Sequence, residues 1–309
     1  MHRKVLGVVA AGITLLALAC GQAAAPTPQK LVIAVQPTNT PEQLASDAKG
    51  MEQFLKSKVG SDVEIVFPTT FAGVIEALRF GHAQAAFMSA WPAALAQKHA
   101  GAEIALAEIR EVLVDNKKVE APYYYSYWVV RKDSPYNALA DLKGKKAALP
   151  SQLSTSGYVA PVARMIELGL LPNDGKEADA KKFFGDVLYA GGYAQGWEAL
   201  KQGQVDVTVI AGDVSESLYR EVLSNTRVVE QQGPIPSHAV VFGKNLQEPQ
   251  RAKLKAALLE LNAPDKQPLM RKFISGIFVG FKPTTGEEHL ASLNKYLNLT
   301  QFQFVERLR

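Results

Sequence analysis

Residues 151–158 read Ser-Gln-Leu-Ser-Thr-Ser-Gly-Tyr, and the fold is organised around this stretch. It follows the short apolar run 147–149 and precedes residues 159–168, whose apolar positions recur at roughly helical spacing. The pattern predicts a strand, a hydroxyl-rich turn and the start of a helix. Hydroxyl side chains there cap the free N–H groups of the first helical turn. Alternatively, the same groups bind an anion, and Gly157 lets the backbone come close to it.

Strand-like and helix-like segments alternate on both sides of this turn. We expect strands at residues 31–35, 63–67, 83–88, 123–131, 147–149, 187–189, a run ending at 211–213, and 237–242. We expect helices at residues 42–59, 72–80, 93–99, 159–168, 194–201, 249–261, 268–274 and 287–297. This alternation predicts parallel sheets with crossover helices. The aromatic run 123–131 fits an amphipathic or edge strand.

Two stretches far apart in the chain share one layout. Residues 77–87 and residues 199–209 each run from a helix end through a glycine into an apolar strand. Two similar α/β lobes would produce such a pair, and 309 residues exceed the usual size of one domain. We assign residues 31–125 and 234–309 to lobe 1 and residues 126–233 to lobe 2. The chain would then cross between the lobes near residues 125 and 234. These two crossing segments would form a hinge, with a ligand cleft between the lobes.

Composition excludes several classes of protein. Hydrophobic residues make up 47% of the chain and can fill two cores, while the charged fraction of 21% contains no long run of one sign. Disorder and a nucleic-acid-binding tail are therefore not expected. Removing Arg3 and Lys4 with the leader leaves 32 basic against 30 acidic residues, which does not indicate a polyanionic partner.

The N-terminus has the pattern of a secretory leader. A basic start is followed by an apolar run over residues 5–19 that is too short to span a bilayer, which needs roughly 20 residues. Small residues then precede Cys20, the single cysteine, which resembles a bacterial lipoprotein cleavage site. We expect residues 1–19 to be a signal peptide, Cys20 to be lipidated and residues 20–30 to be a tether; plain secretion is the alternative.

A linked set of motifs carries a family resemblance. The turn at 154–158 is preceded by Tyr-Trp-Val-Val-Arg-Lys-Asp-Ser at 127–134 and Asp-Leu-Lys-Gly-Lys at 141–145, and residues 74–81 read Val-Ile-Glu-Ala-Leu-Arg-Phe-Gly. In this order the motifs resemble the phosphate-, phosphite- and phosphonate-binding component of bacterial ABC importers, over about residues 31–261. The resemblance implies the type II periplasmic binding protein fold, two α/β lobes joined by a two-strand hinge.

The resemblance also implies the ligand residues. Ser154, Thr155 and Ser156 would hold phosphorus oxyanions through their hydroxyls and through helix N–H groups. The family uses an acidic residue after a Gly-x-Val-Asp strand to accept a proton from P–OH or to meet a ligand amine, and Asp213 is the candidate; a solvated loop aspartate is the alternative. Asp206 fits a strand start better than a ligand contact.

Three positions differ from the residues that are common in the family. Phe71, which follows Thr70 at the turn before the helix 72–80, and Trp91 stand where tyrosines are common, and Tyr193 stands where a histidine is common. Tyrosine donates a hydrogen bond but carries no positive charge near neutral pH. We therefore expect a neutral, hydroxyl-lined pocket with Thr70, Phe71, Trp91 and Tyr193 among its ligand residues, although the aromatic rings also suit simple packing.

The sequence and this resemblance thus predict an extracytoplasmic, lipid-anchored solute-binding protein that delivers a small phosphorus oxyanion (phosphite, phosphate or a phosphonate) to an ABC permease, with no cofactor and no nucleic acid. A sulfonate or a thiamine precursor as ligand, or signalling to a membrane kinase, are the alternatives. An enzyme is not expected, because the common nucleophile, P-loop and zinc motifs are absent. The histidines also form no metal-spaced cluster: His2, His82, His99, His238 and His289.

Overall fold

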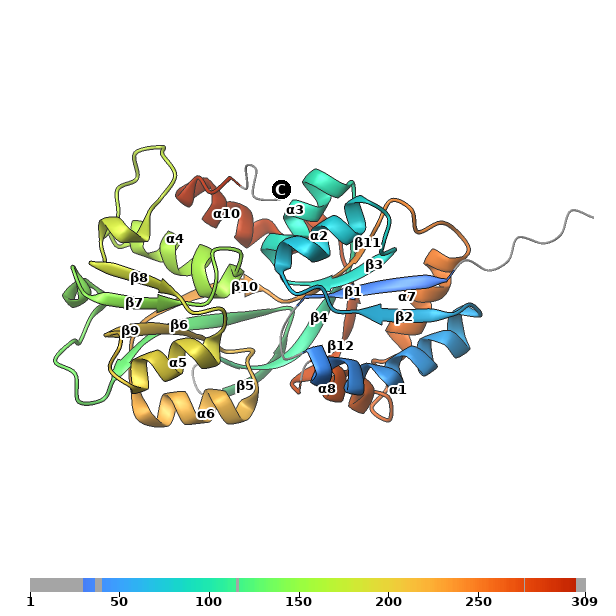
Figure 1. The fold of residues 1–309 in the computed structure, drawn as a ribbon, viewed down its shortest axis with the longest axis horizontal. Helices are drawn as coiled ribbons and strands as arrows, with labels where there is room; N and C mark the ends of the chain where they lie inside the picture. Colours follow the sequence, from blue (N-terminus) through green and yellow to red (C-terminus); the bar gives the residue numbers. More distant parts are fainter. Residues whose placement is uncertain (1–29, 37–40, 115–116, 275, 304–309) are drawn as a thin grey trace, which may run out of the picture.

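Two β-sheets lie side by side, each covered by helices on both faces, in the computed structural model (Figure 1). The structure describes residues 30–36, 41–114, 117–274 and 276–303. The expected leader and Cys20, and all of the tether but Lys30, fall outside these residues. Within the described part of the chain, no helix combines the length and apolarity needed to cross a membrane.

The first sheet has the strand order β12-β4-β11-β3-β1-β2, with β5 paired to β4. Strands β1, β2 and β3 are parallel, and the others are antiparallel to their neighbours. The bounds are β1 Leu31–Val35, β2 Val63–Val66, β3 Ala85–Met88, β4 Glu103–Val114, β5 Lys117–Ala121, β11 Ala239–Phe242 and β12 Phe278–Pro283.

Helices cover both faces of this sheet. One apolar core joins the sheet to α1 (Pro41–Val59), α7 (Gln250–Glu260) and α8 (Gln267–Phe273). The other core joins it to α2 (Phe71–Arg79) and α3 (Ala90–Ala100), with α9 (Gly286–His289) beside β4. Both faces are therefore buried, which explains the continuous apolar runs of β1 and β3.

The second sheet has the order β10-β6-β9-β7-β8. Its strands are β6 Tyr123–Arg131, β7 Lys146–Leu149, β8 Asp186–Tyr189, β9 Val207–Ala211 and β10 Thr226–Pro236. One face packs against α4 (Ala160–Glu167) and the short turns η1 (Leu139–Leu142) and η3 (Ala180–Lys182), and the other against α5 (Tyr193–Lys201) and α6 (Glu216–Asn225). The turn η2 (Thr155–Val159) leads directly into α4.

The repeated layout noticed in the sequence corresponds to a repeated topology. Strand order β2-β1-β3-β11-β4 in the first sheet matches β8-β7-β9-β6-β10 in the second, including which neighbours are parallel. The two helix ends before β3 and β9 close on Gly81 and Gly203, whose φ angles are 77° and 71°. Glycine tolerates this left-handed conformation at helix ends, which explains its place in both copies.

Several sequence expectations were wrong at the level of single elements. The aromatic strand β6 is not an edge strand but lies between β9 and β10, so most of its rings are buried. Strand β5 occupies part of an expected loop, and β4, β12, α6 and β10 were not predicted. Helix α3 begins at Ala90, ahead of the expected residue 93, because proline is compatible with the first turn of a helix.

The chain crosses between the sheets near Pro122 and again near Ser237, and the C-terminal helix crosses once more. Helix α10 (Ala291–Thr300) packs against α4 and β10 of the second sheet (Figure 1), whereas we expected it in lobe 1. Its Tyr296 hydroxyl donates to the carbonyl of Pro234 at 3.1 Å, and Phe302 stacks on Tyr158 at 4.9 Å between ring centroids. The lobe boundaries as a whole remain a proposal.

We predict that His289 makes stability sensitive to acid. Its Nε2 lies 3.0 Å from the carbonyl oxygen of Ser237 at the crossing, and burial lowers its pKa to about 4. The unfolded chain therefore binds this proton more readily, and stability is lost as the pH falls from about 6.5 towards 4, by about 3 kcal/mol for this group. Urea unfolding at pH 7.5 and pH 5 should show a smaller acid loss in His289→Gln. His82→Gln, at an exposed position, is the control; equal acid losses in all three proteins would contradict the assignment.

Candidate functional site

The sequence-predicted ligand residues all follow the carboxyl end of a parallel strand. Open α/β sheets place ligands at this edge, since the connections to the helices gather there. In the second sheet the segments after β7, β8 and β9 carry the turn 154–156, Tyr193 and Asp213. In the first sheet the segments after β2 and β3 carry residues 70–71 and Trp91.

The hydroxyl-rich turn forms the start of a helix, as predicted. Ser154 is the N-cap, and its Oγ accepts a hydrogen bond from the Gly157 N–H at 3.0 Å. The turn η2 that follows has the wide π-helical geometry, which is frequent at functional sites. Among the described residues, the N–H groups of Thr155 and Ser156 have no hydrogen-bond partner. Capping and free donors thus occur together at one helix start.

Four hydroxyl groups from three elements meet beside this turn, and we call Ser154, Ser156, Tyr124 and Tyr193 the hydroxyl cluster. The Tyr193 hydroxyl lies 2.6 Å from Ser156 Oγ and 3.3 Å from Ser154 Oγ, and the Tyr124 hydroxyl donates to Ser156 Oγ at 2.9 Å. Burial, together with the charge of Asp213, raises the pKa of both tyrosines above the ordinary value. The cluster therefore offers neutral donors at any physiological pH.

The first sheet meets the turn through the start of α3. The backbone N–H of Trp91 donates to Thr155 Oγ1 at 2.9 Å, so two helix N-termini face each other across the boundary between the sheets. The N-cap of α3 is Ser89, whose N–H donates to Gln36 Oε1 at 2.7 Å. The buried Ser89 Oγ has no hydrogen-bond partner among the described residues. The Trp91 donor in the contact with the turn is the backbone N–H.

Asp213 is buried in a cluster of charges rather than solvated. Its carboxylate pairs with the guanidinium of Arg110 on β4, which also contacts Glu108 Oε2 through Nε at 2.7 Å. Burial raises the pKa of Asp213, and the Arg110 charge opposes that rise. His238 Nε2 lies 4.0 Å from the same carboxylate, and burial with the Arg110 charge lowers the pKa of His238 well below its usual range. The expected neutral pocket is thus bordered by a buried cation.

The structure brings together most of the predicted residues but not all of them. Ser154, Thr155, Ser156, Tyr193 and Trp91 meet directly. Asp213 lies close enough to affect the tyrosines electrostatically.

Thr70 and Phe71 stand apart from this group. Thr70 is exposed, caps α2 by accepting from Gly73 N at 3.0 Å, and precedes Phe71, the first residue of that helix. A ligand role for these two stays a prediction.

Sequence reasoning missed Tyr124, Ser89, Glu108 and Arg110. A signal for the last two was present, because Glu108 and Arg110 are two residues apart in the otherwise apolar run 104–110 and therefore share one face of a strand. Tyr124 was read only as part of an aromatic strand. Within the described residues, no group of three or more His, Cys, Asp and Glu side chains could hold a metal ion.

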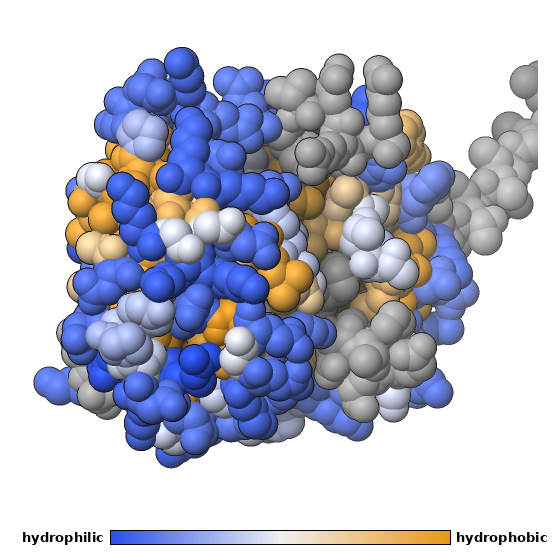
Figure 2. All heavy atoms as spheres, turned by 60° about the vertical axis from the view of Figure 1, so that its left-hand side comes forward, coloured by the Kyte–Doolittle hydropathy of each residue, from blue (hydrophilic) through white to orange (hydrophobic). Residues whose placement is uncertain are grey.

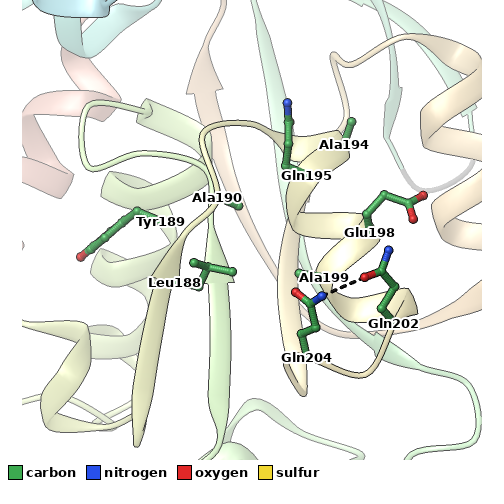
Figure 3. A pocket seen from close by; sticks show the side chains of 9 residues that line it. All are labelled: Leu188, Tyr189, Ala190, Ala194, Gln195, Glu198, Ala199, Gln202 and Gln204. Carbon is green, nitrogen blue, oxygen red and sulfur yellow. Dashed lines mark hydrogen bonds between the residues drawn. The ribbon is translucent and has the colours of Figure 1, made fainter.

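A separate hollow of about 450 Å³ lies between β8 and α5. Figure 3 shows the residues that line it, among them Gln204, which donates to Gln202 at 2.8 Å. It contains no convergent set of donors, so we do not assign the ligand to it. The face of the molecule drawn in Figure 2 is mostly hydrophilic with smaller hydrophobic areas, which is ordinary for a protein surface.

Comparison with known protein families gives a match over residues 33–290, to the family described as ABC transporter, phosphonate, periplasmic substrate-binding protein. The phosphate-import protein PhnD of Mycolicibacterium smegmatis is 30% identical over 213 residues, which are 66% of this chain and 64% of that protein. The phosphonates-binding periplasmic protein of Escherichia coli is 27% identical over 209 residues, 65% of this chain and 57% of that protein. The chain thus spans less than two thirds of the length of these relatives.

A solved structure supports the fold. The binding protein component of an ABC phosphonate transporter from Pseudomonas aeruginosa superposes with a TM-score of 0.70 at 21% identity, covering 87% of this chain and 85% of that one. The two mixed sheets with their covering helices therefore form the architecture of periplasmic binding proteins, as the sequence predicted.

We predict that Gly157→Ala damages the turn. A Cβ at this position would lie 2.7 Å from Pro150 Cγ and 2.8 Å from Ser154 Oγ, so the close approach that glycine allows is to these two residues. Overpacking of this kind costs about 1–3 kcal/mol, and here it would also displace the capping hydroxyl. Chemical denaturation should show this loss. Gly276→Ala, where a Cβ would meet nothing within 4 Å, should change stability by less than about 0.5 kcal/mol; equal effects of both changes would contradict the prediction.

Proposed function

We propose, from the premise that this chain belongs to the family of ABC transporter phosphonate periplasmic substrate-binding proteins, that it captures a small phosphorus oxyanion and delivers it to a membrane permease. Phosphite, phosphate and phosphonates are the candidate ligands. Binding is then the whole chemistry, and the affinity depends on how well fixed donors replace the ligand's water shell.

The observation that carries this proposal is the meeting of neutral donors from both sheets at one point. Thr155 Oγ1 accepts a hydrogen bond from the Trp91 N–H, and Ser156 Oγ contacts the hydroxyls of two tyrosines. An oxyanion has acceptor oxygens pointing in several directions, so it can replace these mutual contacts and draw on donors from both sides. A ligand held in this way joins the two halves of the molecule, which couples its capture to closure.

The chemistry of the donors favours a compact tetrahedral anion. Hydroxyls and free N–H groups at a helix start bind anions without a cationic side chain. The nearby guanidinium of Arg110 is already balanced by Glu108 and Asp213, so it does not add a strong net attraction for a highly charged ligand. The curated relatives named for phosphate import and for phosphonate binding support the same ligand class.

Ser89 extends the donor set on the first sheet. Its hydroxyl is buried at the N-cap of α3 and has no hydrogen-bond partner among the described residues. It lies two residues before Trp91, whose N–H donates to Thr155. A buried hydroxyl that makes no hydrogen bond costs free energy of about 1–3 kcal/mol, and a bound oxyanion would remove that cost. We include Ser89 as a ligand donor together with Ser154, Thr155, Ser156 and Tyr193, and keep Asp213 as an acceptor for a ligand P–OH group.

The lipid anchor and the compartment belong to this proposal as well. The leader pattern before Cys20 supports cleavage there and acylation of the cysteine, which would hold the protein at the outer face of the cell membrane beside its permease.

We expect at least one phosphorus oxyanion to stabilise the protein. A thermal-shift and calorimetric panel of phosphite, phosphate, methylphosphonate, aminoethylphosphonate, sulfate and arsenate tests the ligand class. A ligand at 100 times its Kd adds about 2.7 kcal/mol to the free energy of unfolding. Thr155→Ala with Ser156→Ala should abolish this gain, because two hydroxyls of the turn are lost, and Ser89→Ala should weaken it.

The matched control for these variants is Thr285→Ala. Thr285 caps α9 by accepting from Glu288 N at 3.2 Å, so this change also removes a helix cap, but away from the hydroxyl cluster. It should reduce stability by about 1 kcal/mol and leave the ligand response intact. A panel in which only a non-phosphorus solute stabilises the protein would reject the ligand class and retain the fold.

We also predict that Cys20 carries the anchor. Cys20→Ser should release the protein from the membrane fraction into the soluble extracytoplasmic fraction, since the thiol is the site of acylation. Fractionation of cells expressing either form, with metabolic labelling by a palmitate analogue, checks this. An unlabelled wild-type protein in the soluble fraction would mean plain secretion.

A further inference from the structure

A buried arginine on the first sheet contacts carboxylates from both halves of the molecule. Glu108 and Arg110 lie on one face of β4 and are 0% and 2% exposed. Arg110 Nε and one terminal nitrogen donate to Glu108 Oε2 at 2.7 Å and 2.6 Å, and the other terminal nitrogen pairs with the carboxylate of Asp213. All three nitrogens of the guanidinium are therefore engaged with carboxylates.

Asp213 reaches Arg110 from the second sheet. It follows β9, where the Gly212 N–H donates to the carbonyl of Tyr125 on β6 at 2.7 Å. The ion pair consequently joins β4 of the first sheet to the end of β9 in the second, next to the tyrosines of the hydroxyl cluster. It connects the two halves at a second place besides the contact between Trp91 and Thr155.

Among the described residues, Arg110 is the one cation next to Asp213. The groups that face Asp213 are Arg110 and Glu108 from β4, Tyr124 from β6, Tyr193 from α5 and His238 ahead of β11. The tyrosines are neutral. His238 is close to Asp213, but it is neutral too, and its Nε2 lies 3.2 Å from the amide nitrogen of Gln36.

We propose that Arg110 is a positioning residue that allows the two halves to close: it supplies the charge without which the Glu108 and Asp213 carboxylates could not be buried together. This role rests on the proposed function only in that closure is how the ligand is held. In the described part of the chain, the polar contacts of the Arg110 side chain include one predicted ligand residue, Asp213, and Arg110 acts through that side chain.

The energetics of buried ion pairs give the direction of the effect. A matched buried pair adds little net stability, because desolvation offsets the attraction, but removing one partner leaves an uncompensated buried charge at a large cost. In an open arrangement Asp213 would be hydrated and would need no partner. Loss of Arg110 leaves Glu108 unpaired in either arrangement, but it leaves Asp213 buried and unpaired only in the closed one. It therefore adds a penalty that is specific to closure, and loss of the Asp213 charge as well should relieve that part.

The test compares Arg110→Gln, Asp213→Asn and the double variant with the wild-type chain. The first readout is the radius of gyration from small-angle X-ray scattering without added ligand, which does not depend on the ligand's identity. We expect Arg110→Gln to be more expanded than the wild type, and the double variant to return towards the wild-type value. The second readout is the Kd for inorganic phosphate and for methylphosphonate, which should weaken about tenfold or more in Arg110→Gln.

The control is Arg251→Gln. Arg251 pairs with Glu103, the first residue of β4, inside the first half of the molecule, so its loss should change neither readout. Equal radii of gyration for the wild type and Arg110→Gln would overturn the proposal, and so would a double variant as expanded as the single one. If Arg110→Gln does not fold, Arg110→Lys decides, because it keeps the charge: a wild-type radius supports the proposal and an expanded one overturns it. Failure of both oxyanions to bind the wild type would reject the proposed function alone, since the scattering comparison still stands.

Discussion

The hydrogen bond from the Trp91 N–H to the Thr155 hydroxyl joins the two halves of the molecule at the place where both have unsatisfied donors. A helix start has free N–H groups by construction, and here two such starts face each other across a boundary between sheets. Ser154 satisfies one donor of its own helix, while its neighbours remain available. The place where these two helix starts meet is polar but uncharged. This suits the proposed anionic ligand, which must be both bound and released.

The topology explains how residues so far apart converge. In each sheet the parallel strands end at the same edge, and the helices begin from that edge. The repeat of β2-β1-β3 as β8-β7-β9 places two such edges opposite each other. The third connection, through α10, sets Phe302 against Tyr158 immediately after the hydroxyl turn. Helix α10 contacts the turn η2, α4 and β10, so it belongs to the second half of the molecule.

The charged side chains lie beside the hydrogen-bond donors of the turn rather than among them. Arg110 lies between Glu108 and Asp213, and the tyrosines and His238 around it are neutral. A guanidinium with both carboxylate partners can be buried, whereas the same group alone would attract any anion strongly and release it slowly. In the proposed function the arrangement separates two tasks: neutral groups would recognise the ligand, and the charged cluster would let the halves come together.

The sequence by itself determined the alternation of strands and helices, the repeated unit ending in Gly81 and Gly203, and the hydroxyl turn with its cap, because each depends on local periodicity or on backbone geometry. The family resemblance implied that residues 154–156, Tyr193 and Trp91 would belong to one ligand site, together with Thr70, Phe71 and Asp213. The sequence did not predict β4 with its buried Glu108 and Arg110, the interior position of β6, or the return of α10 to the second sheet. These features depend on which strands become neighbours, and only the tertiary structure decided them, because burial of a charged pair or an aromatic strand depends on partners more than 80 residues away in the chain.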